Sequence, residues 1–358
     1  MEAGDVAPRT NRTASVTIRD VARVAQVSVA TVSRALNDSQ TVTAQTRNHV
    51  LRIARELDFV PHGGARSLSL RRTDTIGVLL PDLHGEYFSE LIRGLDLGAR
   101  NSRQHLLLSA SHGEVSEAVA ALRAVRSRVD GLVVMTPFVD GELVAAAVKG
   151  AVPLVLLNSR DTSHCDVSFA IDNYAGAFNV TTHLIACGHR RIDFISGPPD
   201  NLEARDRLRG FEAAHREAVQ APGRVLRGDF REESGFAAAG QLVGSELPDA
   251  IFAANDAMAI GCLHALRNAG LQVPRDVALA GFDDIPIARF LDPPLTTAGV
   301  AIAEIGRQAI DCCVELVRGN PVSIGCRLFA PELVIRASSG RQSRPDAATS
   351  ATPGRIRS

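Results

Sequence analysis

Short apolar runs that recur between residues 75 and 280 constrain the fold of this chain more than any other feature. Most are separated by roughly 20 to 30 residues with a helical pattern, which is typical of parallel strands joined by right-handed helical crossovers. Their unbroken apolar character indicates strands that are buried on both faces. The pattern therefore predicts a doubly wound α/β body, in which ligands bind beyond the carboxyl ends of the strands. The runs are 76–80, 106–108, 132–134, 154–157, 192–195, 250–253 and 277–280.

Residues 27–36 form a second pattern, a short helix with an apolar inner face and a small, polar outer face. Ser28 is the natural N-cap, because its hydroxyl can accept from a backbone N–H of the first turn. Val32 and Leu36, four residues apart, share the inner face. Small outward side chains let a helix approach another surface closely, and in a DNA major groove they would meet base edges and phosphates. The outward residues are Val29, Ala30, Ser33 and Arg34.

Two further helices are predicted beside this one. Thr17 and Asp20 have the spacing of a capping box, and Thr43 caps a third helix that ends near residue 60. The turn at Gln26 requires a positive φ, for which Gly or Asn is the usual residue. Periodicity alone leaves two interpretations open, a DNA-reading helix pair or two amphipathic helices of an ordinary helical core.

The charge distribution favours a nucleic-acid-binding head. The formal net charge is −1, but residues 1–72 contain 11 Arg against 6 acidic residues, so they carry +5 and leave −6 on the remainder. The six cysteines lack CxxC pairs and His at zinc spacing, so we expect buried thiols, no metal and no cofactor. Residues 1–14 lack the apolar run of a signal peptide, and no stretch approaches about 18 apolar residues, which favours a cytoplasmic location away from membranes.

The N-terminal pattern resembles the helix-turn-helix of the lactose/galactose repressor (LacI–GalR) family of bacterial regulators. The matching runs are Val16-Thr17-Ile18-Arg19-Asp20-Val21-Ala22 and Val27-Ser28-Val29-Ala30-Thr31-Val32-Ser33-Arg34-Ala35-Leu36-Asn37. The body, to about residue 338, resembles the family's effector domain, which is similar in turn to periplasmic sugar-binding proteins. Its markers include Val129-Asp130-Gly131, Arg205-Asp206-Arg207-Leu208-Arg209-Gly210-Phe211 and Gly281-Phe282-Asp283-Asp284. The resemblance implies an α + α/β chain with a three-helix head, a hinge helix and two doubly wound parallel-sheet α/β subdomains of the type I periplasmic-binding-protein kind.

The resemblance also implies a division of the chain. We expect a disordered segment over 1–15, a helix-turn-helix domain over 16–60, a hinge over 61–72, an effector-binding and dimerisation domain over 73–339, and a disordered tail over 340–358. The first subdomain would take about 74–170 and 300–328, and the second about 171–298 and 329–338. The tail has no leucine heptad, so the tetramer-forming helix of one branch of the family is absent and a dimer is expected.

In the family, the segment that matches the hinge becomes helical on operator DNA, pairs with its dimer mate and inserts a leucine into a central minor-groove step. Leu68 lies at the matching position, and Arg66 beside it can bind a phosphate. A plain flexible linker is the alternative interpretation. The predicted DNA-contacting residues are Thr17, Ser28, Val29, Ala30, Thr31, Ser33, Arg34, Asn37, Arg66 and Leu68.

The predicted effector site lies at strand ends. Arg207, Asn255 and Asp283 match positions that hold ligand in the resembled family, and Phe230 matches a stacking aromatic. Across the cleft, the residues that follow the first strand are Asp82, Tyr87 and Phe88. Paired polar groups and an aromatic face suit a sugar-like ligand, because they match its hydroxyls and its C–H surface.

Structural roles compete with some of these assignments. The two aromatic residues after the first strand could belong to a helix core. Arg207 could pair with Asp206 or Glu203 on a solvated face. Asp256 and Asp284 could simply cap helices.

The resemblance implies a sequence-specific transcriptional repressor rather than an enzyme. We expect a homodimer that binds double-stranded, pseudo-palindromic operator DNA under the control of a small-molecule effector, a carbohydrate. The rival interpretation is a cytosolic sugar-binding protein or an enzyme without specific DNA readout. The sequence has no GxGxxG after a strand and no GxxxxGK[ST], HExxH or GxSxG motif, which disfavours the common enzyme classes.

Gly63 and Gly64 give the first testable prediction, because each lowers helix propensity by about 1 kcal/mol relative to Ala. We expect the hinge to be disordered off DNA. The double substitution Gly63→Ala with Gly64→Ala should therefore tighten operator binding in a titration at fixed salt. Unchanged or weaker affinity would contradict the prediction.

Overall fold

The computed structural model describes residues 16–36, 41–59, 72–135, 141–148, 150, 152–160, 163, 165–244, 246–323 and 325–340. Contacts divide the chain into two compact units, residues 1–73 and 74–358. None of the helices in the described ranges combines the length and the apolar character that a bilayer span requires.

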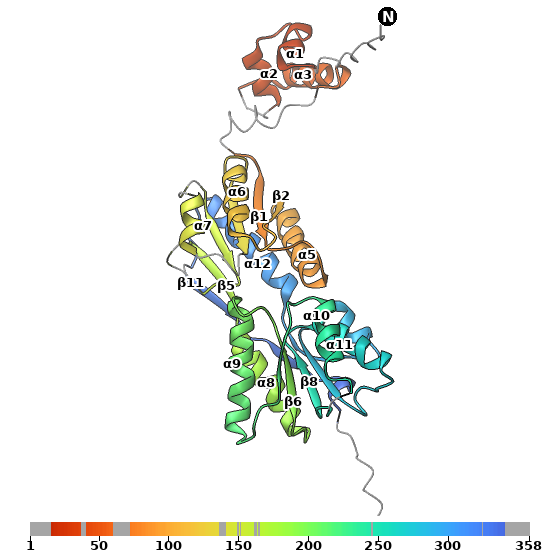
Figure 1. Ribbon diagram of the computed structural model, residues 1–358. Helices are drawn as coiled ribbons and strands as arrows, with labels where there is room; N and C mark the ends of the chain where they lie inside the picture. The colour runs from red at the N-terminus through yellow and green to blue at the C-terminus, as the bar shows by residue number, and fades with distance from the viewer. Residues whose placement is uncertain are drawn as a thin grey trace, which may run out of the picture. The chain divides into compact units, whose positions relative to one another are not determined.

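The first unit is a bundle of α1 (Ile18–Val24), α2 (Val29–Leu36) and α3 (Ala44–Glu56), drawn in red and orange in Figure 1. The predicted caps are confirmed: Thr17 N donates to Asp20 Oδ2 at 3.0 Å, and Ser28 Oγ accepts from Thr31 N at 3.0 Å. Gln26 adopts the positive φ that the turn requires, at 54°. A small apolar core, which includes Val21, Val32, Val50 and Ile53, holds the three helices together.

The second unit contains two six-stranded sheets. In the first, all pairings are parallel and the strand order is β11-β5-β4-β3-β1-β2. In the second, the order is β12-β10-β9-β8-β6-β7, and only β12 runs antiparallel to its neighbour. The first sheet comprises β1 (Thr75–Leu80), β2 (His105–Ala110), β3 (Gly131–Met135), β4 (Leu154–Leu157), β5 (Val167–Ile171) and β11 (Gly325–Phe329). The second comprises β6 (Ile192–Ser196), β7 (Val225–Arg227), β8 (Ala250–Ala253), β9 (Ala278–Asp283), β10 (Thr296–Gly299) and β12 (Glu332–Val334).

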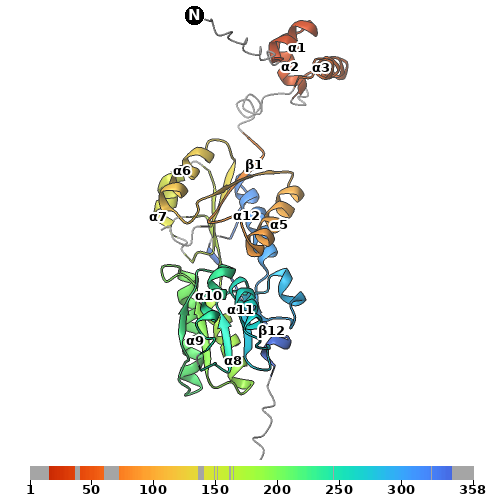
Figure 2. The ribbon, with the colours of Figure 1, turned by 45° about the vertical axis from the view of Figure 1, so that its right-hand side comes forward.

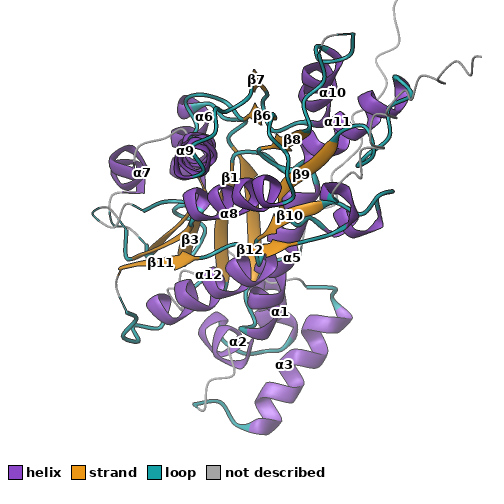
Figure 3. Cartoon of the chain, turned by 90° about the horizontal axis from the view of Figure 1, so that it is seen from below, coloured by secondary structure: helices purple, strands orange, loops and turns teal. Residues whose placement is uncertain are grey.

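Helices cover both sheets. The first sheet carries α5 (Glu86–Asn101), α6 (Val115–Val125), α7 (Gly141–Val148) and α12 (Ile302–Val317). The second carries α8 (Asn173–Ala186), α9 (Leu202–Glu217), α10 (Glu232–Gly240) and α11 (Asp256–Asn268), with short 3-10 turns at η1 (Pro286–Phe290) and η2 (Ala337–Ser339). α10 packs along α11, as Figure 2 shows, and α8 packs along α9. In Figure 3, strands of the second sheet lie between α8 and the α10–α11 pair.

Alternation along the strands explains why both faces of the first sheet are covered. Val78 and Val133 belong to the core with α5 and α12, whereas Leu79 and Val134 belong to the core with α6 and α7. Because successive side chains of a strand point to opposite faces, an unbroken apolar run needs a helix layer on each side. The doubly wound architecture predicted from these runs is therefore confirmed.

Each predicted run lies in a strand, except that Val277 precedes β9, and two further details differ. The strand β2, which contains the run 106–108, is at the edge of its sheet and is partly exposed rather than buried on both faces. β9 continues to Asp283, so this residue ends the strand instead of following it. The sequence reasoning missed five strands: β5, β7, β10, β11 and β12. β7, β11 and β12 are at sheet edges, and β10 has only four residues, two of them Thr. β5 is fully buried, and its apolar run is interrupted by Ser168.

The close approach of α5 and α12 gives a test of the packing. A Cβ on Gly94 would overlap the backbone carbonyl of Ala303, whereas one on Gly240, at the end of α10, would meet nothing within 4 Å. We expect Gly94→Ala to lower the free energy of unfolding by about 1 to 3 kcal/mol through overpacking. Gly240→Ala, the matched control, should raise it by about 0.5 to 1 kcal/mol because Ala is the better helix former.

Chemical denaturation of both variants would measure the difference. A Gly94→Ala protein as stable as the control would mean that the two helices do not meet backbone to backbone.

Candidate functional site

The outward face of α2 is small, polar and accessible. Val29 is 43% exposed, Ala30 and Arg34 are also exposed, and Ser33 is half-buried, whereas Val32 and Ala35 are buried. Thr17 and Ser28 are exposed near the N-termini of α1 and α2, and Thr31 is half-buried. The predicted contacts Asn37, Arg66 and Leu68 lie outside the described residues. The helix thus has the steric profile that entry into a major groove requires.

A cavity of about 330 Å³ opens between the two sheets, and every predicted effector residue lines it. From the first sheet come Asp82, Tyr87 and Phe88, which follow β1; from the second come Arg207 on α9, Phe230 after β7, Asn255 after β8 and Asp283 at the end of β9. Parallel strands of each sheet end on this side, so the side chains that follow them converge. Whether these residues bind an effector remains a prediction.

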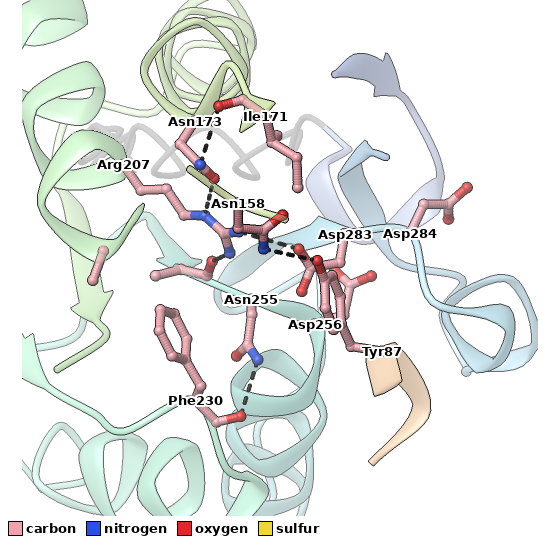
Figure 4. Close-up of polar contacts among 12 residues, drawn as sticks. Tyr87, Asn158, Ile171, Asn173, Arg207, Phe230, Asn255, Asp256, Asp283 and Asp284 are labelled. Carbon is pink, nitrogen blue, oxygen red and sulfur yellow. Dashed lines mark hydrogen bonds and ion pairs between the residues drawn. The ribbon is translucent and has the colours of Figure 1, made fainter. Parts of the chain in front are cut away.

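Arg207 and Asp283 form a buried ion pair in the wall of this cavity (Figure 4). They are 3% and 4% exposed, and Arg207 Nη2 lies 3.3 Å from Asp283 Oδ1. Arg207 Nε donates to Asn173 Oδ1 at 2.8 Å, and Nη1 donates to the carbonyl of Ala254 at 2.5 Å. The guanidinium also lies 3.8 Å from the ring centroid of Phe282. These contacts fix the orientation of the arginine on all sides.

The alternative that Arg207 pairs with Asp206 or Glu203 on a solvated helix face is wrong. Arg207 is buried and pairs with Asp283, while Asp206 pairs with Arg209 at 2.8 Å. Burial raises the pKa of Asp283 to about 6, and the charge of Arg207 limits the increase. Asp283 also has a φ of 112°, a region that non-glycine residues seldom occupy and that is concentrated at functional sites.

Asn255 lines the cavity and holds the backbone of Phe230 in place. Its Oδ1 accepts from Met258 N at 3.0 Å and caps α11, and its Nδ2 donates to the carbonyl of Phe230 at 2.9 Å. Phe230 has a φ of 73°, so the bond from Asn255 holds a strained loop residue against the cavity. The amide of Asn255 therefore positions the aromatic ring that was predicted to stack on a ligand.

Tyr87 and Phe88 combine the two roles considered for them. Both pack on the hydrophobic core and both line the cavity, with an edge-to-face arrangement and ring centroids 5.4 Å apart. Tyr87 Oη accepts from Asn158 Nδ2 at 3.1 Å, which holds the phenol at the cavity wall. Burial raises the pKa of Tyr87, so the phenol stays neutral.

The alternative that Asp256 and Asp284 cap helices is not what the structure shows. Asp256 is fully buried and accepts from Ile285 N at 3.0 Å and from Thr297 Oγ1 at 2.7 Å. Burial raises its pKa well above the usual range. Asp284 pairs with Arg336 at 2.7 Å. Both aspartates therefore tie neighbouring segments of the second sheet together, and Asn255 provides the cap.

Sequence reasoning missed Glu203 as a cavity residue. It lies in the first turn of α9, lines the cavity, and its Oε1 is buried with no hydrogen-bond partner among the described residues. Burial raises its pKa to about 7; Arg207 opposes this shift and Asp283 adds to it. The available signal was spacing, because a residue four before Arg207 on a helix shares its face.

The raised pKa of Glu203 predicts a pH-dependent stability. The native state holds this proton more tightly than the unfolded chain, whose glutamate has a pKa near 4.5, so stability falls as pH rises from about 4.5 to 7. Glu203→Gln should therefore raise the free energy of unfolding by about 1 to 3 kcal/mol at pH 8 and by much less at pH 5. The control Glu217→Gln changes an exposed residue of the same helix and should show no such difference. An equal effect of Glu203→Gln at both pH values, measured by denaturation, would contradict the prediction.

Comparison with known proteins agrees with this architecture. Residues 17–62 match the family described as bacterial regulatory proteins, lacI family, and residues 181–339 match the periplasmic binding protein-like domain. The chain is 34% identical to the HTH-type transcriptional repressor CytR of Escherichia coli (strain K12), over 91% of this chain and 96% of that protein. It is 35% identical to the HTH-type transcriptional repressor PurR of Haemophilus influenzae (strain PittEE), over 90% of this chain and 98% of that protein.

A solved structure is similar over the same extent. The Lac repressor dimer bound to operator and the anti-inducer ONPF matches with a TM-score of 0.81 and 29% identity, covering 91% of this chain and 100% of that one. These similarities identify a DNA-binding repressor controlled by a small-molecule effector, and not an enzyme. The chain belongs to the lacI family of bacterial regulatory proteins.

Proposed function

We propose that the protein is a homodimeric repressor, acting in the cytoplasm, whose operator affinity is set by a carbohydrate or sugar derivative bound between the two sheets. The observation that carries this proposal is the Arg207–Asp283 pair, buried and fully oriented in the wall of a cavity that both sheets line. An ion pair removed from water is expensive, so its retention in a cavity favours a binding role.

The cavity has the chemistry that a polyhydroxylated ligand needs. Asp283 can accept from one hydroxyl while Arg207 donates to its neighbour, which matches a pair of adjacent hydroxyl groups. Phe230, Tyr87 and Phe88 provide aromatic surface for the C–H face of a sugar ring. A volume of about 330 Å³ lies in the range of pockets for small molecules.

Control of DNA binding follows from the place of the cavity. A ligand that touches both sheets binds more tightly to one relative arrangement of the two subdomains than to another, and so shifts their equilibrium. The size of the shift equals the difference of the two binding free energies, so a ligand that binds both arrangements equally would leave operator affinity unchanged.

On the DNA, two copies of α2 would read the half-sites of a pseudo-palindrome. Val29 and Ala30 would meet base edges, while Arg34 would bind guanine or phosphate. The remaining proposed contacts are Thr17, Ser28, Thr31, Ser33, Asn37, Arg66 and Leu68.

Asp283→Ala tests the two halves of this proposal separately. We expect the variant to bind operator as the wild type does. It should lose the response to ligand, because the carboxylate that accepts from one ligand hydroxyl beside Arg207 is gone. The operator would first be selected from a random-sequence library by gel shift, and the ligand from a thermal-shift panel of monosaccharides, polyols and nucleosides.

The control is Asp206→Ala, which removes a carboxylate from the same helix as Arg207 but one that is outside the ion pair. It should keep both activities. If no palindrome is selected, the DNA-reading role of α2 is wrong, and loss of both activities in Asp283→Ala together with a lowered melting temperature would indicate misfolding instead.

A further inference from the structure

The cavity has an excess of negative charge. Its carboxylates outnumber its guanidinium groups by six to two. The carboxylates are Asp82, Glu86, Glu203, Asp229, Glu232 and Asp283, and the guanidinium groups are Arg207 and Arg231. A cleft lined by one sign of charge concentrates ligands of the opposite sign.

Several of these acids already have protein partners. Asp283 pairs with Arg207, and Asp82 Oδ2 lies 3.7 Å from Arg231 Nη2. Asp229 Oδ1 accepts from the backbone N–H of Arg231 at 2.9 Å. Glu86 Oε2 accepts from Ile287 N at 3.1 Å. Both arginines are thereby engaged. Glu86, Asp229 and Glu232 are exposed to solvent, so the acids partly or fully withdrawn from water are Asp82, Glu203 and Asp283.

Glu203 is the acid that the described residues leave least satisfied. Its Oε1 is shielded from solvent and has no hydrogen-bond partner there, although the side chain of Asn173 donates a hydrogen bond to the carboxyl group. The nearest cation, Arg207, uses its Nε, Nη1 and Nη2 on Asn173, Ala254 and Asp283. The charged and titratable groups that act on Glu203 are Arg207 and Asp206 of α9, Asp283 of β9 and Tyr87 of α5.

We propose that the effector carries a protonated amino group that binds Glu203, so that it is an amino sugar or an aminated polyol and not a neutral carbohydrate. This inference rests on the proposed function, because it assumes that the cavity is the effector site. A protonated amine provides N–H donors for the unpartnered Oε1 and offsets the negative charge of the cavity. Charge-assisted bonds of this kind in a shielded site are worth more than bonds to a neutral hydroxyl.

Matched pairs of probes test the proposal on the full-length protein. The first pair, D-glucosamine and D-glucose, represents the ring form. The second pair, 1-amino-1-deoxysorbitol and sorbitol, represents the open chain. Calorimetric titration of the wild type should show at least tenfold tighter binding of the amine in one of the pairs. In Glu203→Gln the ratio should fall to within about twofold, because the amide keeps the shape and loses the charge.

Glu217→Gln is the matched control, since it makes the same chemical change at an exposed position of α9. It should keep the wild-type ratio. A pH series on the open-chain pair adds a second readout, because an aliphatic amine stays protonated across neutral pH. The affinity of the wild type for the amine should rise between pH 5.5 and 8 as Glu203 ionises, and that of Glu203→Gln should stay flat.

Three results would overturn the proposal. The first is a wild type that binds the hydroxyl members as tightly as the amines, and the second is a Glu203→Gln protein that keeps the wild-type ratio. The third is a wild type that selects a palindromic operator and binds neither amine. In each of these cases the repressor function stands, whereas a wild type that selects no operator would overturn the proposed function itself.

Discussion

The buried pair of Arg207 and Asp283 imposes the strictest constraint on the second unit. Removing two charges from water costs several kcal/mol per ion, and the cost is offset only when the geometry is good and the remaining donors are satisfied. Here α8 supplies Asn173, the segment after β8 supplies the Ala254 carbonyl, and β9 supplies both Asp283 and the ring of Phe282. The pair therefore depends on the relative positions of α8, α9, β9 and the segment after β8, and it orients the polar groups that a ligand would meet.

The same constraint explains the organisation of the cavity as a whole. Asn255 holds Phe230, Asn158 holds Tyr87, and Asp256 ties β10 to the segment after β9. Asn255 and Asn158 thus fix the positions of the aromatic side chains that line the cavity. Polar bonds also cross between the subdomains, from Arg231 to Asp82 and from Ile287 N to Glu86. These contacts form or break when the relative arrangement of the two sheets changes. A ligand-controlled repressor has to couple that arrangement to its DNA-binding unit.

The family and the general function followed from the resemblance of the two motif regions, and the fold class followed from the apolar runs together with that resemblance; all three are confirmed. Helix caps at Thr17, Ser28 and Thr43 depend on residues three apart, so they could be predicted without tertiary information. Strands buried on both faces are recognisable because each residue is apolar. Edge strands such as β7 and β12 were missed, because each has only three residues and neither is an unbroken apolar run. The domain boundaries and the site residues remain predictions.

The sequence by itself determined the three capped N-terminal helices, the seven strands that contain the predicted runs and the set of residues at strand ends, because these depend on spacing along the chain. Only the tertiary structure decided how those residues are used. It pairs Arg207 with a carboxylate 76 residues away instead of with its helical neighbours, and it makes Asn255 hold Phe230. It also leaves the Oε1 atom of Glu203 without a hydrogen-bond partner among the described residues. The hydrogen-bond partners, the burial and the charge balance of these residues arise from contacts between segments far apart in the sequence. A local pattern therefore does not predict which of several acids a buried arginine pairs with.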